Sequence, residues 1–520
     1  MPKTEQKNVF HARTKLLKIK DWEELIAIVN EQDAREYWIN AFDKIELVYN
    51  WNEKIVVNAD LTNDDKIVKP GQIGIFKDIY EKFHIAEGES VWVSFTKNSL
   101  QSVEAIKKKL TGGKLNYDEI YAIIKDISEN KLTDTLITYY VASSFLHETT
   151  NEEMYQTAKA MAETGVTFHY PEWSIVADKH CIGWVPGNET SMIMIPTLAS
   201  LGIKMPKNFS KAITSPAATG ECVSVLMDIE FDKPWIEKLI EENNCCLIRG
   251  WALDLAPADD KIIRVSYPLS LQNIAKVVSS IMAKKYAMGI THSLIDIPMW
   301  PTAKVPDLKT ALERKKKFEY VGKKLWMKMC VEITKADQPI WAGIWATLQV
   351  REVLRVLQQH PLRPLDLEEK ALHLCVRIIE IVWMARWKKA LEIAKKELVS
   401  WKAWNMMKKI IKTQRVQKKD RWILTDIDKI NSENLPTTKI IYQYKSKKSG
   451  KIIDIDMKIL NNVTRTLWSP LDLEAGIYLD KKVSNDIKNW ELLCTLYTND
   501  QKKLKMAIDI IENSEMYKIE

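Results

Sequence analysis

Apolar and polar positions follow two different periods along the first third of the chain. Short apolar runs separated by turn residues, such as Pro70-Gly71, occupy residues 15–97. Such runs are typical of a small β-rich module. Beyond residue 98 the apolar positions recur at helical spacing, most clearly over 118–127 and 152–164. We therefore expect a β-rich module followed by a helical domain.

Strand-like and helical segments alternate from residue 168 to about residue 334. This alternation is typical of an α/β domain with a central sheet. A helical pattern follows over 353–412, and residues 425–520 return to short apolar runs with one late helix at 501–512. The strands expected in the α/β part are 174–177, 246–248, 262–265 and 293–297.

Together these patterns predict an α/β multidomain protein with four parts. The parts are a small β-rich N-terminal module at 1–97, a helical domain at 98–167 that helices near 190–202 complete, a central α/β phosphate-binding domain at 168–424 that includes the helical block 353–412, and a C-terminal α+β domain at 425–520. At 520 residues the chain is long enough for each part to bury a core.

The composition narrows the class of protein without indicating a reaction. Apolar residues make up 46% and charged residues 28% of the chain, which are ordinary values for a soluble protein. No apolar run is long enough to cross a bilayer, and the polar first 13 residues lack the apolar core of a signal peptide. The seven cysteines have no metal-site spacing. We therefore expect a cytoplasmic protein with reduced thiols, no membrane partner and no metal.

The net charge of +7 invites comparison with nucleic-acid-binding proteins. The basic residues are spread along the chain, however, and two of the densest groups, 314–317 and 388–408, lie in helical patterns. Solvated lysine faces explain such groups, so no nucleic-acid partner is expected. The charge is compatible with attraction of small phosphorylated substrates.

The segment 178–191 has the residue types of a phosphate-binding loop. A glycine-rich turn in front of a helix N-terminus directs backbone N–H groups at an anion. The segment contains a cation, a titratable ring, two glycines and two hydroxyls, namely Lys179, His180, Gly183, Gly187, Thr190 and Ser191. Trp184 is the exception, because its side chain would fill the space of the anion.

Three further segments could complete one site. Ser280 and Lys284 lie one helical turn apart and share a face, although a solvated pair is the usual interpretation of such residues. Lys304 ends a segment that leaves a predicted strand at Asp296. A hydroxyl-rich run suits a phosphate or a ribose, although a capped loop has the same composition. It contains Ser210, Lys211, Ala212, Ile213, Thr214, Ser215 and Thr219.

Taken together, these segments resemble the nucleoside phosphorylase family that includes thymidine phosphorylase and the archaeal-type AMP phosphorylase. The resemblance covers nearly the whole chain and is specific to this long, archaeal-type branch. It rests on the pieces 179–183, 210–219, 255–260, 280–285, 296–298, 338–340 and 351–352 and, toward the two ends, on 68–74 and 474–478.

The resemblance implies a pentosyltransferase that takes inorganic phosphate as co-substrate and needs no cofactor. Phosphate attacks C1′ of a ribosyl group and displaces the base, which is chemistry that depends on positioning and electrostatics. Lys284 matches a base-contacting lysine of the thymidine-specific relatives. By position, phosphate would contact Lys179, Cys181, Gly183, Ser191 and Thr219, and the nucleotide would contact Trp184, Ser210, Lys211, Ala212, Ile213, Thr214, Ser215, Thr219, Ser280 and Lys304.

One position departs from the pattern of the family. The resemblance places the proton donor to the leaving base, an aspartic acid in AMP phosphorylases, at Gln272. A glutamine amide donates hydrogen bonds but is not a general acid near neutral pH. His180 is the nearby alternative whose ordinary pKa lies in the right range. The catalytic candidates are therefore Gln272 and His180.

The tryptophans are a second departure. The chain has 19 Trp and 16 Gly, although Gly normally makes up about 7% of residues. Glycine serves where the backbone has a positive φ or approaches another segment closely. The codon UGA encodes Trp in some genetic codes and Gly in others. We hypothesise that glycine occupies these positions in the natural protein; the alternative is divergence into an inactive protein. The resemblance implies glycine at Trp184, Trp251, Trp300, Trp326, Trp341, Trp345, Trp383, Trp387, Trp401, Trp468 and Trp490, and at Trp38, whereas Trp404 and Trp422 fit as tryptophan.

Three functions remain open at the level of sequence. The first choice is phosphorolysis of a nucleoside 5′-monophosphate, in which AMP and phosphate give adenine and ribose 1,5-bisphosphate. The alternative is a thymidine phosphorylase that gives thymine and 2-deoxyribose 1-phosphate, favoured by 289–292 and 301–304. The third is an inactive nucleotide-binding homologue, motivated by Gln272 and Trp184. The resemblance further implies a homodimer or a larger homo-oligomer.

Overall fold

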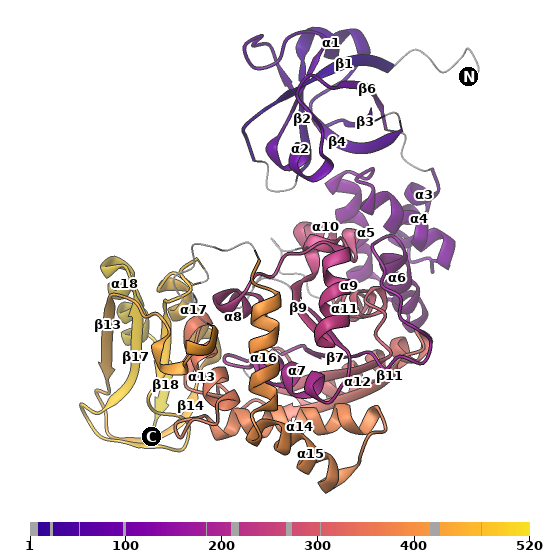
Figure 1. Cartoon of the computed structure of the whole chain (residues 1–520). Helices are drawn as coiled ribbons and strands as arrows, with labels where there is room; N and C mark the ends of the chain where they lie inside the picture. The colour runs from indigo at the N-terminus through magenta and orange to yellow at the C-terminus, as the bar shows by residue number, and fades with distance from the viewer. Residues whose placement is uncertain are drawn as a thin grey trace. The chain divides into compact units, whose positions relative to one another are not determined.

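The described residues form two compact units. The computed structural model describes residues 9–20, 24–50, 52–96, 100–183, 185–209, 218–266, 273–301, 303–416, 427–469 and 471–520. Unit 1 contains the described residues of Met1–Gly165 and Ala256–Asn273, and unit 2 those of Val166–Leu255 and Ile274–Glu520 (Figure 1). The expected fold class is confirmed, because a β-rich N-terminal module, a helical domain, a central α/β part and a C-terminal α+β part are all present.

Unit 1 begins with a closed barrel of six strands in the order β1-β5-β2-β4-β3-β6. Buried and exposed residues alternate along β1 and β3, as the period of two in the sequence requires. The inward side chains include Phe10, Ala12, Ile45 and Leu47. The elements are β1 (Val9–Leu16), β2 (Ile26–Asn30), α1 (Glu31–Tyr37), β3 (Lys44–Tyr49), β4 (Glu53–Thr62), β5 (Gln72–Ile75), α2 (Lys77–Phe83) and β6 (Ser90–Phe95).

The rest of unit 1 is helical. Capping boxes begin two of the helices, where Asn116 pairs with Glu119 and Thr150 with Glu153. Glu153 also accepts a hydrogen bond of 2.7 Å from Lys109, and both side chains are buried. This ion pair joins the first and fourth helices of the set, which comprises α3 (Leu100–Leu110), α4 (Tyr117–Ser128), α5 (Asp134–Leu146), α6 (Asn151–Glu163) and α10 (Pro257–Ser266).

Helix α10 overturns one expected strand. The strand expected at 262–265 is wrong, because these residues lie in α10. Ala258, Asp259 and Ile262 are buried at helical spacing, and the helix packs against α4 and α5. Tertiary packing has therefore overridden a β-branched local pattern. The described residues of Ala256–Asn273, which we expected in the central domain, pack with unit 1.

The central part of unit 2 is built on parallel strands. β7 (Ala177–Cys181), β10 (His292–Met299) and β11 (Lys328–Lys335) form one sheet in the order β11-β10-β7, and β8 (Met205–Phe209) pairs with β9 (Cys245–Arg249). The strands expected at 246–248 and 293–297 lie inside β9 and β10, whereas the strand expected at 174–177 begins at Ala177. The first seven residues of β10 are buried, as in a parallel sheet covered on both faces.

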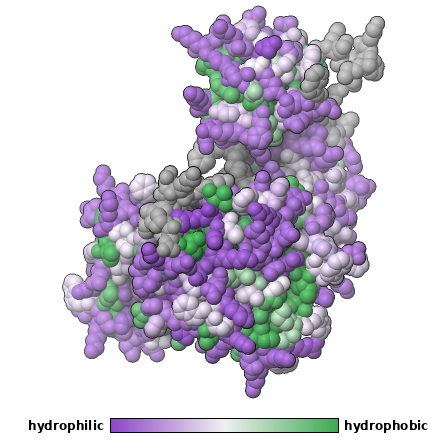
Figure 2. All heavy atoms as spheres, in the orientation of Figure 1, coloured by the Kyte–Doolittle hydropathy of each residue, from purple (hydrophilic) through white to green (hydrophobic). Residues whose placement is uncertain are grey.

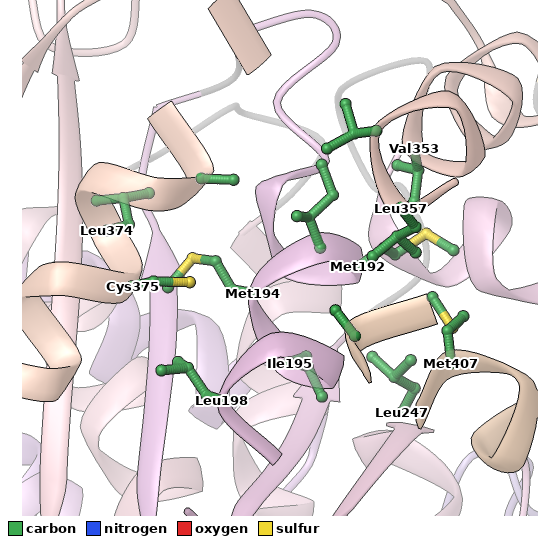
Figure 3. Packing of buried hydrophobic residues seen from close by; sticks show 14 of the residues in the cluster. Met192, Met194, Ile195, Leu198, Leu247, Val353, Leu357, Leu374, Cys375 and Met407 are labelled. Atoms are coloured by element: carbon green, nitrogen blue, oxygen red, sulfur yellow. The ribbon is translucent and has the colours of Figure 1, made fainter. Parts of the chain in front are cut away.

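Helix α7 (Thr190–Ser200) lies at the centre of this part. Its residues from Thr190 to Ala199 are all buried, which is typical of a helix that is apolar all round. Figure 3 shows Met194 beside Cys375 of α14 (Leu365–Ile381) and Met192 near Leu357 of α13 (Ala346–Leu357). The other helices are α8 (Thr219–Leu226), α9 (Lys233–Asn243), the 3-10 turn η2 (Gly250–Leu253), α11 (Ile274–Ala287), α12 (Leu308–Lys324), α15 (Trp387–Val399) and α16 (Lys402–Thr413).

The C-terminal part has two small antiparallel sheets and two helices. The short strand β12 (Gly343–Ile344), which precedes α13, pairs with β15 and so joins the larger sheet. Helix α18 spans the expected residues 501–512. The elements are η4 (Ile427–Lys429), η5 (Ser432–Asn434), β13 (Ile440–Lys445), β14 (Gly450–Ile455), α17 (Met457–Thr466), β15 (Gly476–Leu479), β16 (Asp486–Ile487), β17 (Leu492–Thr498), α18 (Gln501–Glu512) and β18 (Tyr517–Ile519).

The surface in Figure 2 is predominantly hydrophilic. Among the helices of the described ranges, none combines the length and the apolar character that a membrane span requires.

Eight tryptophans have a positive φ, and they make up eight of the seventeen such non-glycine residues in the described part of the chain. All eight belong to the twelve positions that the resemblance assigns to glycine. The residue that follows Trp326 in sequence, Met327, donates its N–H to the Gly322 carbonyl at 2.9 Å. In the same way Met384, which follows Trp383, donates its N–H to the Ile379 carbonyl at 3.1 Å. These are helix ends whose left-handed residue is usually glycine. The eight are Trp38, Trp326, Trp345, Trp383, Trp387, Trp401, Trp468 and Trp490.

Candidate active site

The segment between β7 and α7 presents a cation and a helix N-terminus at one place. Lys179 of β7 is buried, and its Nζ donates a hydrogen bond of 2.9 Å to Thr190 Oγ1 in the first turn of α7. Glu189 precedes the helix without capping it through its side chain. Backbone N–H groups at an uncapped helix N-terminus favour an anion. Ser191, also predicted to bind phosphate, is buried in the same turn.

Two glycines allow the backbone conformation and the close packing of this loop. Gly187 has a φ of +78°, and a Cβ there would lie 2.5 Å from Nε1 of Trp341. A Cβ on Gly183 would collide with the ring of Pro298, which lies in β10. Both positions therefore require glycine. Trp341 itself is fully buried, and its Nε1 has no hydrogen-bond partner among the described residues.

The buried carboxylate of Asp296, in β10, lies next to Asn188 of the loop. Asn188 Nδ2 donates to Cys181 Sγ at 3.0 Å and lies 3.5 Å from Asp296 Oδ2. Thr334 Oγ1 donates to Asp296 Oδ1 at 2.6 Å, and Lys370 Nζ of α14 lies 3.3 Å from Oδ2. Burial raises the pKa of Asp296, but Lys370, Lys179 and these hydrogen bonds outweigh burial and hold it below its ordinary value. The site therefore contains a permanent anion that orients Asn188.

A second carboxylate, Glu189, lies beside the predicted phosphate contact Thr219. Thr219 Oγ1, in the first residue of α8, donates to Glu189 Oε1 at 3.4 Å. Burial raises the pKa of Glu189 to about 7. Near neutral pH this group is therefore partly protonated, which weakens its repulsion of an anion.

Four lysines from separate segments lie close enough to His180 to affect its pKa. Burial and the positive charges of Lys207, Lys179, Lys284 and Lys304 lower the pKa of His180 well below its ordinary value. The expectation that His180 titrates near neutral pH is therefore wrong for this structure, because the ring is neutral there. The lysines come from β8, β7, α11 and the segment after β10. Burial lowers the pKa of Lys304 to about 8 and that of Lys207 to about 7.

The structure thus brings part of the predicted site together. Ser280 and Lys284 are half-buried on α11, and Lys284 is close enough to act on His180. Trp184, Gln272 and the run Ser210 to Ser215 lie outside the described residues. No group of three or more His, Cys, Asp or Glu side chains within the described ranges is placed to hold a metal ion.

Sequence reasoning missed three polar residues of this region. Lys207 lies in the middle of the buried strand β8, and a lysine within an apolar strand is a signal that could have found it. Glu189 lies within the predicted loop 178–191 and could have been weighed as an acid in an anion site. Lys370 gave no signal, because its role depends on the packing of α14 against β10.

Comparison with protein families finds two matching domains. Residues 103–165 match the helical bundle domain of the glycosyl transferase family. Residues 454–518 match the pyrimidine nucleoside phosphorylase C-terminal domain. These ranges lie in the helical domain of unit 1 and the C-terminal part of unit 2.

Similar proteins extend over nearly the whole chain. The AMP phosphorylase of Thermococcus kodakarensis is 34% identical over 493 residues, which is 95% of each chain. A putative thymidine phosphorylase of Methylococcus capsulatus is 31% identical and covers 92% of this chain and 90% of its own length. Among solved structures, anthranilate phosphoribosyltransferase from Thermus thermophilus has a TM-score of 0.50 at 13% identity, over 60% of this chain and 99% of that one. The last likeness concerns the fold alone.

Proposed function

The chain belongs to the nucleoside phosphorylase family of thymidine phosphorylases and AMP phosphorylases, and we propose that its substrate is a nucleoside 5′-monophosphate. The reaction converts AMP and inorganic phosphate to adenine and ribose 1,5-bisphosphate. The observation that supports a nucleotide is that Lys179, Lys284 and Lys304, from three separate segments, each lie close enough to His180 to lower its pKa. These three cationic side chains exceed the needs of a single phosphate, whereas a nucleotide brings a second one to the same site.

In this proposal, different residues of the chain bind the two reactants. Lys179 and the first turn of α7 hold inorganic phosphate, with Thr219 beside them. A phosphate oxygen bonds to C1′ as the C1′–N bond breaks, and the electron pair of that bond stays with the base. The sugar is oxocarbenium-like in between, so an anionic nucleophile fixed nearby stabilises it. Ser280, Lys284 and Lys304 contact the nucleotide in this proposal.

The leaving base poses the main chemical difficulty. Gln272 cannot supply a proton, and the lysines keep His180 neutral. Adenine leaves most easily when one of its ring nitrogens is protonated. A pyrimidine spreads the developing negative charge onto carbonyl oxygens, where Lys284 can stabilise it. The missing acid therefore favours thymidine phosphorolysis as the second candidate function.

Gln272→Asp tests the role of this position. If a missing acid limits purine release, this variant raises kcat for AMP about 100-fold or more and leaves kcat for thymidine nearly unchanged. Phosphate-dependent release of free base, followed by chromatography, measures both rates. Gln272→Asn is the matched control, since it changes size without adding an acid. Equal rates with AMP in wild type and Gln272→Asp would contradict the assignment of the proton-donor position.

A further inference from the structure

Three buried charged side chains next to the site form a cluster that the proposed reaction does not explain. Asp178 and Lys285 are each 1% exposed, and Lys207 is 5% exposed. Lys285 Nζ contacts Asp178 Oδ2, and Lys207 Nζ lies 3.3 Å from Asp178 Oδ1. The three residues belong to β7, α11 and β8, so one carboxylate joins three elements of unit 2.

Stability alone does not account for such a cluster. Removing charges from water costs several kcal/mol per ion, and apolar side chains of similar volume often serve stability as well or better. A buried polar contact does fix geometry, because it is satisfied in one arrangement only. The cluster also reaches the loop directly, since Lys207 Nζ donates to the Lys179 carbonyl at 2.7 Å.

The sequence neighbours of the pair are the predicted substrate contacts. Asp178 precedes Lys179 in β7, and the two side chains point to opposite faces of the strand. Lys285 follows Lys284 in α11, about 100° further round the helix. The contact between Asp178 and Lys285 therefore constrains the rotation of α11 about its axis relative to β7. That rotation decides where the shared face of Ser280 and Lys284 points.

We propose that Asp178 and Lys285 are a positioning pair that orients Ser280 and Lys284 toward the nucleoside. Neither residue touches the substrate; they act through α11. This inference rests on the proposed function for the role of Ser280 and Lys284, but the orientation of α11 can be measured without turnover.

The test compares three variants of the full-length protein with a matched control. Lys285→Met breaks the pair and leaves Asp178 paired with Lys207. Asp178→Asn with Lys285→Met removes both charges of the pair, and Lys207 keeps its hydrogen bond to the Lys179 carbonyl. Lys285→Arg keeps a cation. The control is Lys109→Met with Glu153→Gln, which removes a buried pair of similar exposure in unit 1. Thermal unfolding identifies variants that are as stable as the control.

Two measurements decide the outcome. Labelling of the Lys284 amine by acetic anhydride, read by peptide mass spectrometry, should change severalfold in the double charge-removing variant and stay unchanged in the control. In the same variant KM for AMP should rise about tenfold or more, with partial recovery in Lys285→Arg, because a misplaced binding group loses much of its effect. Unchanged Lys284 labelling in a stable double variant would overturn the positioning role. If the wild-type protein turns over neither AMP nor thymidine, the proposed function fails, and the labelling still decides the positioning role.

Discussion

At the residue scale, the tryptophans with positive φ are the most unusual feature of this protein. An L-residue in the left-handed region costs about 1–2 kcal/mol, and a bulky side chain rarely occupies it. Here eight tryptophans do so. Trp326 is 92% exposed, so no burial offsets its strain. Trp404, which fits as tryptophan, lies instead in regular helix within α16 and is buried. The backbone thus favours glycine at eight of the twelve positions that the resemblance assigns to glycine.

Replacing Trp326 by glycine should stabilise the protein. The expected gain in the free energy of unfolding is about 1 kcal/mol, because relief of the left-handed strain exceeds the added entropy of the unfolded chain. Trp92→Gly is the control, since Trp92 is also exposed but lies in strand β6. That change should cost about 0.5–1 kcal/mol. Urea denaturation measures both, and a loss of stability in Trp326→Gly would contradict the account.

The codon hypothesis has its own direct check. In protein purified from its natural source, mass spectrometry of the peptide that spans position 326 should give the mass for glycine. A peptide with tryptophan there would mean that the strain is real and that the chain has diverged.

Single residues also mark the limit of what the sequence could predict. Lys179, Ser191 and Thr219 were nominated by loop composition and resemblance, and the structure places them around one helix N-terminus. The protonation state of His180 could not be predicted, because it depends on burial and on lysines 27 to 124 residues further along the chain, from Lys207 to Lys304. Ordinary pKa values fail where several like charges meet.

At the scale of secondary-structure elements, strong hydrophobic periodicity correctly predicted that a helix or a strand is present and which of the two it is. The helix at 501–512 and the strand at 293–297 follow from their spacing and were found there. The strand expected at 262–265 failed because α4 and α5 supply partners that favour a helix, and local pattern alone does not contain that information. Short apolar runs are ambiguous between helix and strand for this reason.

The contact between α13 and η5 predicts a pH dependence of stability. Arg355 of α13 donates two hydrogen bonds to Glu433 of η5, at 2.7 and 2.8 Å. These bonds lower the pKa of Glu433 from 4.5 to about 2. A depressed carboxyl pKa contributes stability above the unfolded-state value and loses it as the pH falls toward the folded-state value. The contact should therefore stabilise the protein fully above about pH 4.5 and cease to do so near pH 2.

Glu433→Gln isolates this contribution. The difference in urea midpoint between wild type and Glu433→Gln should be constant above pH 4.5 and shrink toward zero as the pH falls to about 2. The difference is modest, because the Glu433 side chain is 41% exposed and solvent screens the pair. Asp428→Asn, at an exposed ion pair with Lys408, is the control and should show little change. An increase in the urea-midpoint difference as the pH falls would contradict the predicted direction of the pH dependence.

At the scale of the whole molecule, the candidate site is assembled from distant parts of unit 2. Lys179, Lys207, Lys284 and Lys370 are spread over nearly 200 residues of sequence. No local pattern links them. The segments of Lys179 and Lys284 were grouped as one candidate site from their residue types, and the family resemblance gave the two lysines their roles. Lys207 and Lys370 became visible once β8 and α14 were placed beside the loop.

The residues assembled at this site include features that favour each of the two candidate substrates, AMP and thymidine. A surplus of cationic side chains suits a nucleotide, whereas the lack of an acid at the proton-donor position Gln272 suits a pyrimidine leaving group. Relatives of both kinds match this chain at 31% and 34% identity. Turnover therefore has to be measured with both classes of substrate.

The most direct test is phosphate-dependent release of free base from AMP, thymidine and uridine. The protein should carry glycine at the twelve suspect tryptophan positions, including Trp184 of the phosphate loop. We predict release of adenine from AMP that requires both inorganic phosphate and the 5′-phosphate. Release of thymine from thymidine alone would move the enzyme to the second function. A folded protein that binds nucleotide but releases no base from any of the three would contradict catalysis altogether.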